Sequence, residues 1–442
     1  MTPAARLAAA IDLLDALEAQ PRRPADATAN DFFRARRYIG GGDRRAINEL
    51  AWSVVRQRLR LDWWLARIRC RPTARMLVAA ELLLDQGLDL PQVLASFPGG
   101  QYAAEPLSTL EERLLRQLDA SRGGIEGLVH PEMPEAIRLD LPEWVLPGFR
   151  ARFGDRLVEE AAAMEEEAPL DLRANLLKTT REEAAAALAA EGIETRPTPF
   201  SPWGLRLPQR RPVTQTRAFT EGLVEVQDEG SQLIALLTDA RPGMRVVDLC
   251  AGAAGKTLAL AGAMRNRGRI TACDVSAPRL EGAVKRLRRA GADNVERHLL
   301  APGDRWAKRR AGQFDRVLVD APCTGTGTWR RNPDARLRTN QNDLAELCTK
   351  QAEILAGAAD LVRPGGRLVY ATCSLLPDED EAQIEAFLGR HPDFAPFPLA
   401  EAWAEAGGIG APPAEGPYLV TSPARHGTDG FFAAVLQRQP EG

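Results

Sequence analysis

The spacing of hydrophobic residues changes twice along the chain. Up to about residue 125, apolar residues recur at helical spacing, first from Ala4 to Ala19 and then in a stretch that begins at Asp43. Asp43 has the side chain of a helix N-cap, and residues 73–86 and 107–118 repeat the helical pattern. We therefore predict an all-α bundle for residues 1–125.

A shorter, more mixed pattern follows in residues 126–222. The stretch from Asp171 to Lys178 is typical of a strand, and Thr180 is placed to cap a helix that Gly192 would end. A hairpin is expected around Trp203-Gly204-Leu205. These features predict a small α+β domain.

From residue 223 to residue 442, β-prone runs alternate with helical ones. This alternation predicts an α/β, Rossmann-like domain with a parallel, doubly wound sheet, closed by a hairpin near the end of the chain. The predicted strands are 245–249, 269–274, 295–300, 316–320 and 367–371, the predicted helices are 256–264, 278–290 and 342–361, and the hairpin pairs 416–420 with 430–436.

Composition limits the class of protein. A chain of 442 residues exceeds one ordinary core, and 45% hydrophobic with 26% charged residues matches a globular, multidomain protein. The six cysteines are dispersed, and none stands near one of the four histidines at zinc-ligand spacing. We expect no metal, no disulfide framework, no membrane span and, without a signal-peptide pattern, a cytoplasmic protein.

The net charge of −3 argues against a basic coat over the whole molecule. Basic residues nevertheless cluster, either as solvated helix faces or as a positive field on one side of the last domain. The helical region likewise either scaffolds or binds a partner through its arginines. The clusters are Lys285-Arg286-Leu287-Arg288-Arg289, Lys308-Arg309-Arg310, Arg330-Arg331 and Arg336 with Arg338, and the arginines of the helical region are Arg34, Arg36, Arg37, Arg44, Arg45 and Arg56.

Two cysteines follow predicted strands of the last domain. Cys323 lies in Asp320-Ala321-Pro322-Cys323-Thr324-Gly325, and Cys373 lies in Tyr370-Ala371-Thr372-Cys373-Ser374. The carboxyl ends of parallel strands form the ligand-binding edge of such a sheet. Two thiols at that edge indicate covalent chemistry, although either cysteine alone would more often be a small buried hydrophobe.

A turn of small residues follows the first strand of this domain, at Asp248-Leu249-Cys250-Ala251-Gly252-Ala253-Ala254-Gly255-Lys256-Thr257. A phosphate-binding P-loop would need glycine where Cys250 stands. The turn suits a ligand that lies against the backbone, and Asp274, at the end of the next strand, could accept hydrogen bonds from a ribose. Dehydrogenases share these features, and a plain structural turn also fits.

Methylation at C5 of a pyrimidine is a reaction that requires a cysteine nucleophile. C5 is a poor nucleophile until a thiolate adds at C6, and the adduct then needs a base to remove the C5 proton. An isolated thiol has a pKa of about 8.5, so such a site must favour the thiolate. In Asp320-Ala321-Pro322-Cys323 a thiol stands where methyltransferases of exocyclic amines carry an aromatic residue.

These motifs resemble those of the Sun-type (Nop/Sun) RNA cytosine-C5 methyltransferases. The resemblance covers most of the chain and includes the cofactor loop, both cysteine motifs and three further stretches. Those stretches are Gln227-Asp228-Glu229-Gly230-Ser231, Arg330-Arg331-Asn332-Pro333-Asp334 and Thr428-Asp429-Gly430-Phe431-Phe432. Within the cofactor loop, Gly252, Ala253 and Ala254 replace the family's Ala, Pro and Gly, which leaves a less rigid turn.

The resemblance implies a class I S-adenosylmethionine-dependent methyltransferase and gives its residues roles. Cys373 would be the nucleophile on C6, Cys323 would assist breakdown of the adduct, and Asp320 would hold the cytosine beside the methyl donor. Cys70, Cys273 and Cys348 are expected to serve packing alone. The residues implied for the cofactor are Cys250, Ala251, Gly252, Ala253, Ala254, Gly255, Lys256, Asp274, Arg279, Asp304 and Asp320.

The resemblance also implies the partner. Residues 1–125 look like the NusB-like module of the ribosomal members, and residues 126–222 look like a small RNA-recognition domain. We therefore expect a monomer that forms 5-methylcytosine in small-subunit ribosomal RNA. Transfer RNA remains an alternative substrate, and a non-catalytic RNA-binding assembly factor remains an alternative function.

Overall fold

The computed structural model describes residues 1–301 and 303–440. The chain divides into two compact units, which we call the helical unit and the catalytic unit. The helical unit comprises residues 1–150, 155–165 and 331–340, and the catalytic unit comprises residues 151–154, 166–330 and 341–442. The domain boundaries near residues 125 and 222 stay a prediction.

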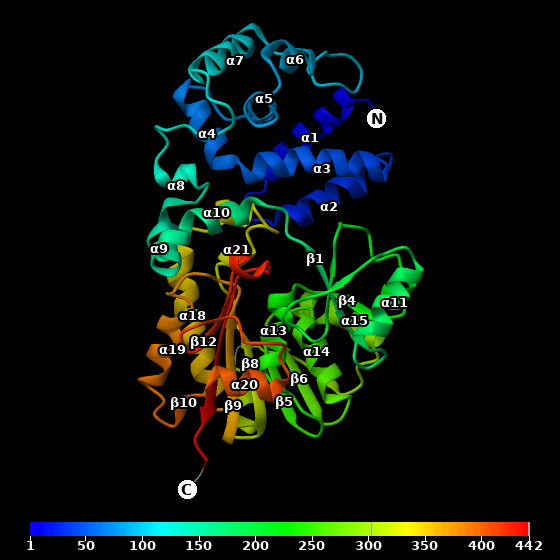
Figure 1. The fold of residues 1–442 in the computed structure, drawn as a ribbon, viewed down its shortest axis with the longest axis vertical. Coiled ribbons are helices and arrows are strands. Elements are labelled where there is room, and N and C mark those ends of the chain that lie inside the picture. The colour runs from blue at the N-terminus through cyan, green and yellow to red at the C-terminus, as the bar shows by residue number, and fades with distance from the viewer. Residues whose placement is uncertain (302, 441–442) are drawn as a thin grey trace. The chain divides into compact units, whose positions relative to one another are not determined.

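The helical unit packs around α5 (Figure 1). Every residue of this helix except Arg75 is buried. Leu77, Val78 and Leu83 of this helix are fully inaccessible, and residues of α1, α3, α4 and α7 close around them in one core. The helices are α1 (Pro3–Glu18), α2 (Ala25–Ala35), α3 (Gly41–Arg56), α4 (Arg58–Arg67), α5 (Ala74–Leu84), α6 (Leu90–Ala95), α7 (Thr109–Ser121), α8 (Glu135–Arg138), α9 (Leu146–Phe153), α10 (Leu157–Glu165) and α17 (Ala335–Arg338).

Asp43 does not cap a helix, contrary to the prediction. The helix α3 begins at Gly41 with Gly40 as its N-cap. The carboxylate of Asp43 instead binds Arg6 Nε at 2.7 Å and the amino terminus of Met1 at 3.1 Å. The carboxylate thus binds two cationic donors, one from α1 and one at Met1, instead of the backbone N–H groups at the start of α3. Hydrogen bonds to charged donors are stronger than those to backbone N–H groups.

Residues 331–340 belong to the helical unit, although they follow the Cys323 motif in sequence. Arg336 is buried there and forms an ion pair of 2.5 Å with Asp140, which is also buried. Asp334 accepts a hydrogen bond of 3.0 Å from the backbone N–H of Ala25, at the start of α2. The chain therefore leaves the catalytic unit after Arg330 and re-enters it at Gln341.

A small antiparallel sheet, with strand order β2-β3-β1-β4, begins the catalytic unit. The predicted strand from Asp171 to Lys178 ends early, at Ala174, because Asn175 turns the chain by donating to the carbonyls of Gly222 and Ala290. Thr180 caps α11 as predicted, and β2 pairs with β3 as a hairpin. The elements are β1 (Leu170–Ala174), α11 (Arg181–Ala190), β2 (Arg196–Pro197), β3 (Gly204–Leu207), α12 (Arg217–Thr220) and β4 (Val224–Val226).

The main sheet of the catalytic unit has the predicted parallel core. Its order is β11-β12-β13-β9-β8-β5-β6-β7, with β10 paired to β13. Pairing from β9 to β7 is parallel, and the closing strands β12 and β13 are antiparallel. The strands are β5 (Arg245–Leu249), β6 (Arg269–Asp274), β7 (Val295–Leu299), β8 (Phe314–Asp320), β9 (Val362–Thr372), β10 (Phe394–Pro396), β11 (Ala414–Glu415), β12 (Tyr418–Thr421) and β13 (Phe431–Arg438).

Helices cover both faces of this sheet, because alternate strand residues point to opposite sides. Val246, Leu318 and Val369 join a core with α13, α14 and α20, whereas Val247 and Val317 join a core with α18 and α19 (Figure 1). The helices are α13 (Glu229–Leu237), α14 (Gly255–Met264), α15 (Ala277–Ala290), α16 (Trp306–Arg309), α18 (Gln341–Ala359), α19 (Glu381–Leu388), α20 (Leu399–Ala406) and α21 (Pro423–His426).

The strand order reverses between β5 and β8. From β5 the chain proceeds through β6 and β7 on one side, and β8 then pairs with the other side of β5. A topological switch of this kind opens a crevice at the carboxyl ends of the strands, where ligands bind in doubly wound sheets. The turn after β5 and the Asp320 motif after β8 border this crevice.

Candidate active site

The two cysteines lie together at the carboxyl ends of β8 and β9. These strands are parallel neighbours in which Asp320 pairs with Ala371. Cys323 Sγ is 3.4 Å from Cys373 Sγ, and both residues are partly exposed. Strand pairing thus brings together two cysteines that are 50 positions apart in the sequence.

The environment of Cys323 favours its protonated form. The hydrogen bond with Cys373 raises the pKa of the Cys323 thiol well above its usual value, and burial adds to the effect. Cys323 is thus the protonated partner that can donate a hydrogen bond to the Cys373 sulfur. The backbone N–H of Gly327 donates to the carbonyl of Cys373 at 2.9 Å, which joins the two cysteine loops.

The motif near the end of the chain supports the Cys323 loop. Gly430 donates its N–H to the carbonyl of Gly327 at 2.8 Å, and the close approach of the two backbones leaves no room for a side chain at either glycine. Asp429 accepts a hydrogen bond of 2.7 Å from Arg330 Nε. The Phe431 ring lies 5.5 Å from Lys256 Nζ.

Lys256 reaches across the crevice to Asp320. Its Nζ is 2.6 Å from Asp320 Oδ2. Burial works against the charged form, but the Asp320 carboxylate outweighs it and raises the pKa of Lys256 above its usual value. Lys256 was predicted only as part of the cofactor loop. The structure directs its ammonium group to Asp320, the acid of the Cys323 motif.

The turn after β5 is held in an unusual backbone conformation. Cys250, Gly252 and Ala254 have φ angles of 60°, 56° and 61°, so left-handed residues alternate along the turn. Asp274 supports it, because its carboxylate accepts hydrogen bonds from the N–H groups of Gly252 at 2.8 Å and Ser276 at 2.7 Å. Each Asp274 oxygen keeps further acceptor capacity.

Two arginines that the sequence analysis did not assign to the site bind the outer side of this turn. Arg173 of β1 donates to the carbonyl of Gly255 at 2.9 Å, and Arg286 of α15 donates to the carbonyl of Ala253 at 2.8 Å. Burial lowers the pKa of Arg173 to about 10. An arginine at a buried position of a strand was the one signal in the sequence that could have identified Arg173.

Asp248 lies beneath the turn and is fully buried. Its Oδ2 accepts a hydrogen bond of 2.6 Å from Thr257, and its Oδ1 has no hydrogen-bond partner. Burial raises the pKa of Asp248 to about 7, and burial likewise raises the pKa of Cys250 to about 12. Cys250 is therefore a neutral thiol in the turn.

The remaining predicted cofactor residues come from three places in the chain, which are the loop before α16, the first turn of α15 and the turn after β5. The carboxylate of Asp304 is 2.6 Å from His298 Nε2 and accepts a hydrogen bond of 2.8 Å from the N–H of Trp306. Arg279 is exposed in the first turn of α15. Ala251 donates its N–H to the carbonyl of Cys273 at 2.8 Å. Pro302, which precedes Asp304 in the predicted motif, lies outside the described residues.

Cys348 differs from the packing role expected of it. Cys70 and Cys273 are buried, but Cys348 is partly exposed on α18, and its Sγ donates to the carbonyl of Asp378 at 3.5 Å. Cys348 belongs to neither of the two hydrophobic cores that cover the sheet.

Several arginines of the predicted basic clusters form ion pairs within the protein, so they do not contribute to a positively charged surface. Arg286 and Arg289 both pair with Glu225, and Arg330 pairs with Asp429. In the helical unit, Arg336 pairs with Asp140. Buried partners thus neutralise these side chains, and removing one partner would leave a buried charge uncompensated.

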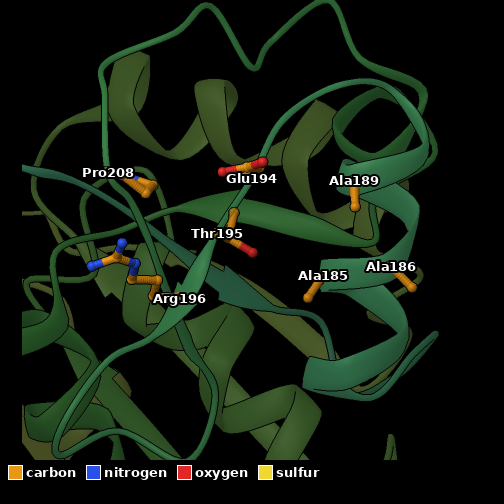
Figure 2. A pocket seen from close by; sticks show the side chains of 7 residues that line it. All are labelled: Ala185, Ala186, Ala189, Glu194, Thr195, Arg196 and Pro208. Carbon is orange, nitrogen blue, oxygen red and sulfur yellow. The ribbon is translucent and has the colours of Figure 1, made fainter.

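Other arginines do gather at a surface. In the helical unit a hollow of about 450 Å³ is lined by Asn30, Phe33, Arg34, Arg37, Arg44 and Asn48. In the catalytic unit a hollow of about 370 Å³ lies beside α11 and β2. Figure 2 shows the side chains that line it, which are Ala185, Ala186, Ala189, Glu194, Thr195, Arg196 and Pro208. None of these seven residues belongs to the crevice at the switch point.

Among residues 1–301 and 303–440, no helix is long and apolar enough to cross a membrane. The same residues contain no group of His, Cys, Asp or Glu side chains that could hold a metal ion.

Two sequence profiles match this chain. The profile described as 16S rRNA methyltransferase RsmB/F matches residues 235–437. The profile described as an RsmF/B-like methyltransferase, ferredoxin-like domain, matches residues 141–214.

Curated relatives match nearly the whole chain. The "Probable ribosomal RNA small subunit methyltransferase B" of Synechocystis sp. is 33% identical over 413 residues, which is 90% of this chain and 91% of the relative. The "Ribosomal RNA small subunit methyltransferase B" of Klebsiella pneumoniae is 32% identical over 410 residues, with the same two shares.

Solved structures agree on the fold. PH0851 covers 99% of both chains at 25% identity and a TM-score of 0.76. A methyltransferase homologue from Pyrococcus horikoshii covers 70% of this chain and all of its own, at 29% identity and a TM-score of 0.60. These comparisons confirm the resemblance and the multidomain fold class predicted from the motifs. The chain belongs to the RsmB/F family of Sun-type, S-adenosylmethionine-dependent methyltransferases.

Proposed function

We propose that this protein transfers a methyl group from S-adenosylmethionine to C5 of a cytosine in small-subunit (16S) ribosomal RNA, through a covalent adduct between Cys373 and C6. The observation that carries the proposal is the pair of sulfurs 3.4 Å apart at the ligand-binding edge of the sheet. The ion pair of Lys256 with Asp320 beside them supports it.

The residues around the turn after β5 fit the methyl donor. The turn from Cys250 to Lys256 has small side chains, so a ligand can approach its backbone closely. Asp274 keeps acceptor capacity for the two hydroxyl groups of a ribose. The buried Asp248 Oδ1 provides a further acceptor without a partner. When bound, S-adenosylmethionine would supply an electrophilic methyl group.

The first step needs Cys373 as a thiolate. In our proposal Cys373 loses its proton to solvent, and the Cys323 thiol stabilises the resulting thiolate by donating a hydrogen bond to it. The Cys373 thiolate then bonds to C6 of the cytosine while the electrons of the C5–C6 double bond shift toward C5. Lys256 and Asp320 would lie at the N3 and N4 edge of the base, where negative charge develops. The enamine carbon C5 then has the nucleophilicity that methyl transfer requires.

The second step needs a base, and formation of the adduct supplies it. Once Cys373 is bonded to C6, it no longer holds the Cys323 proton by a hydrogen bond, which is the main reason for the raised pKa of Cys323. The pKa of Cys323 then falls, its proton leaves to solvent, and the resulting thiolate removes the C5 proton. Electrons return to the ring, the C6–S bond breaks, and Cys373 departs as a thiolate.

The choice of RNA rests on the relatives and on charge. Relatives named ribosomal RNA small subunit methyltransferase B cover 90% of this chain. We propose that residues 1–125 bind RNA through the hollow lined by Arg34, Arg37 and Arg44, where guanidinium groups can bind phosphates. Residues 126–222 would help present the extruded cytosine, which costs least in single-stranded or looped RNA.

Two substitutions test the chemistry. Cys373→Ala should abolish transfer of a tritiated methyl group to ribosomal RNA. Cys323→Ala should leave a protein–RNA adduct that survives a denaturing gel, because release fails after attack. Cys348→Ala is the control, since this thiol lies on α18 and makes no sulfur–sulfur contact with the pair among the described residues, and it should methylate normally. Full methyl transfer by Cys373→Ala would disprove the proposal.

The RNA class needs a separate measurement. Bisulfite sequencing of ribosomal and transfer RNA, from cells with and without the gene, should show one or more cytosines of small-subunit RNA losing their methyl group. Loss confined to transfer RNA would contradict the proposed substrate but not the chemistry. Unchanged methylation in both RNAs would favour a non-catalytic assembly role.

A further inference from the structure

Two adjacent carboxylates behind the cysteine loops have no part in the steps above. Glu379 and Asp380 follow the Cys373 loop and precede α19, and both are fully buried. Burial of two neighbouring acids is costly unless each is well paired. Their hydrogen bonds therefore indicate what these acids are for.

Glu379 binds one chain neighbour of Cys323 directly and the other through Gln351. Its Oε1 accepts a hydrogen bond of 2.8 Å from the N–H of Thr324, and its Oε2 accepts one of 2.5 Å from the Thr324 hydroxyl. Gln351 Nε2 donates to Glu379 Oε1 and to the carbonyl of Pro322, both at 2.9 Å. Cys323 is thus fixed from both sides through one carboxylate and one amide.

Asp380 does the same for Cys373. Its Oδ1 accepts a hydrogen bond of 2.6 Å from the Thr372 hydroxyl, whose oxygen in turn accepts the N–H of Ser374 at 3.1 Å. Its Oδ2 is 2.8 Å from Arg152, a buried guanidinium of the same unit. Residues 372 and 374 flank Cys373, so this chain of bonds sets the direction of its side chain.

The two networks meet at one peptide. Glu379 and Asp380 are consecutive, and the carbonyl of Glu379 accepts a hydrogen bond of 2.7 Å from the Tyr370 hydroxyl, which anchors the pair to β9. The Thr326 hydroxyl is also 3.2 Å from that of Ser374, so the loops touch directly. A displacement of either carboxylate would change the distance between the two sulfurs.

We propose that Glu379 and Asp380 are positioning residues with separate tasks: Glu379 sets Cys323 for release of the adduct, and Asp380 sets Cys373 for attack. The inference rests on the proposed function. Neither acid touches the base or the methyl donor in this scheme, and each acts through the threonine beside its cysteine.

The amide variants separate these tasks. Glu379→Gln replaces one acceptor oxygen by an NH₂ group that faces the donors of Thr324 and Gln351, and Asp380→Asn does so toward Thr372 or Arg152. If the acids served stability alone, both variants would slow attack and release alike. Separate tasks predict opposite adduct signatures from two neighbouring substitutions.

The experiment uses the full-length protein, RNA substrate and S-adenosylmethionine, with the adduct quantified on denaturing gels over time. Glu379→Gln should form adduct at a rate within about threefold of wild type and release it at least tenfold more slowly. Asp380→Asn should form adduct at least tenfold more slowly. In a Cys323→Ala background, Asp380→Asn should slow accumulation of the trapped adduct, whereas Glu379→Gln should add nothing.

Three variants keep the test decisive. Thr324→Val and Thr372→Val remove only a hydroxyl group, so they should reproduce the Glu379 and Asp380 signatures even if an acid variant fails to fold. Asp378→Asn changes the exposed acid next in sequence and should behave as wild type. Equal losses of attack and release in both members of a pair would overturn the inference. If Cys323→Ala alone traps no adduct, the proposed function itself fails.

Discussion

Ala254 carries backbone strain in the turn that we propose binds the methyl donor. Its φ of 61° and ψ of 31° lie in the left-handed region, which costs an L-residue with a Cβ about 1–2 kcal/mol. Ala254→Gly removes that cost but gains disorder in the unfolded chain, worth about 0.4–1 kcal/mol. We expect the free energy of opening of α14, measured by hydrogen exchange, to rise by up to about 1 kcal/mol.

Gly252 provides the converse control. Its φ of 56° is also left-handed, and a Cβ there would meet no atom within 4 Å, so Gly252→Ala adds strain without a clash. Protection of α14 should fall by about 1 kcal/mol. If both variants change protection in the same direction, backbone strain is not what limits this turn.

Variants of the ion pair between Lys256 and Asp320 can distinguish its contribution to stability from its contribution to methyl transfer. Lys256→Met leaves the Asp320 carboxylate without its cation, and Asp320→Asn leaves the ammonium without its acid, so each single variant should lower the melting temperature. The double variant should recover most of the lost stability yet remain at least 100-fold impaired in methyl transfer. Recovery of activity together with stability would show that the pair serves folding alone.

Single residues were predictable where their motif was continuous in sequence. Cys323, Cys373 and Asp320 stand next to strands that the hydrophobic pattern identified, so strand pairing alone brought them together. The contact of Arg173 with the turn was not predictable, because its partner carbonyl at Gly255 lies in another element, 82 residues away. Bonds between distant residues leave no periodic signature in a single sequence.

At the scale of elements, α5 contains an acid that makes the helical unit sensitive to pH. Glu81 is fully buried and binds the Ser53 hydroxyl of α3, and burial raises its pKa to about 8. Between pH 4.5 and about 8 the folded state therefore holds a proton that the unfolded state releases, so stability falls as pH rises through this window and levels off above it.

Glu81→Gln should remove this dependence, because the amide keeps an acceptor for Ser53 and cannot ionise. Hydrogen exchange of α5, corrected for intrinsic rates, should lose protection from pH 5 to 8.5 in the wild type and lose less in the variant. Taking the difference between the two proteins cancels other titrating groups. Parallel pH profiles would contradict a buried, protonated Glu81.

The elements themselves were largely predictable, and their limits less so. The strands of the parallel core were predicted within a few residues, because alternating and continuous apolar runs set them. The limits failed where a polar side chain had a long-range partner. Asn175 ends β1 because its side chain donates hydrogen bonds to the carbonyls of Gly222 and Ala290. Asp43 does not cap α3 because its carboxylate binds Arg6 and the amino terminus.

At the scale of the whole molecule, the chain passes from one unit to the other within the sequence that follows Cys323. Arg330 pairs with Asp429 in the catalytic unit, whereas residues 331–340 are part of the helical unit. No hydrophobic pattern could reveal this excursion, since it is short and its main anchor is the charged Arg336. The backbone after the Cys323 loop is therefore tied covalently to the packing of the helical unit.

The ion pair of Arg336 with Asp140 determines whether this segment stays in place. Both side chains are buried, and burial raises the pKa of Asp140 to about 6. Arg336→Met would therefore leave a buried, negatively charged carboxylate without its cation at neutral pH. Removing one partner of a buried pair costs about 3–5 kcal/mol. Hydrogen exchange of residues 331–340 should accelerate at least 100-fold, while β8 and β9 keep their protection.

Leu337→Ala, an exposed change on the same helix, should leave exchange unchanged. The double change Arg336→Met with Asp140→Leu should restore protection, because it removes the stranded charge. If exchange of 331–340 is as slow in Arg336→Met as in the wild type, the segment is held by other contacts and the Cys323 loop does not depend on this pair.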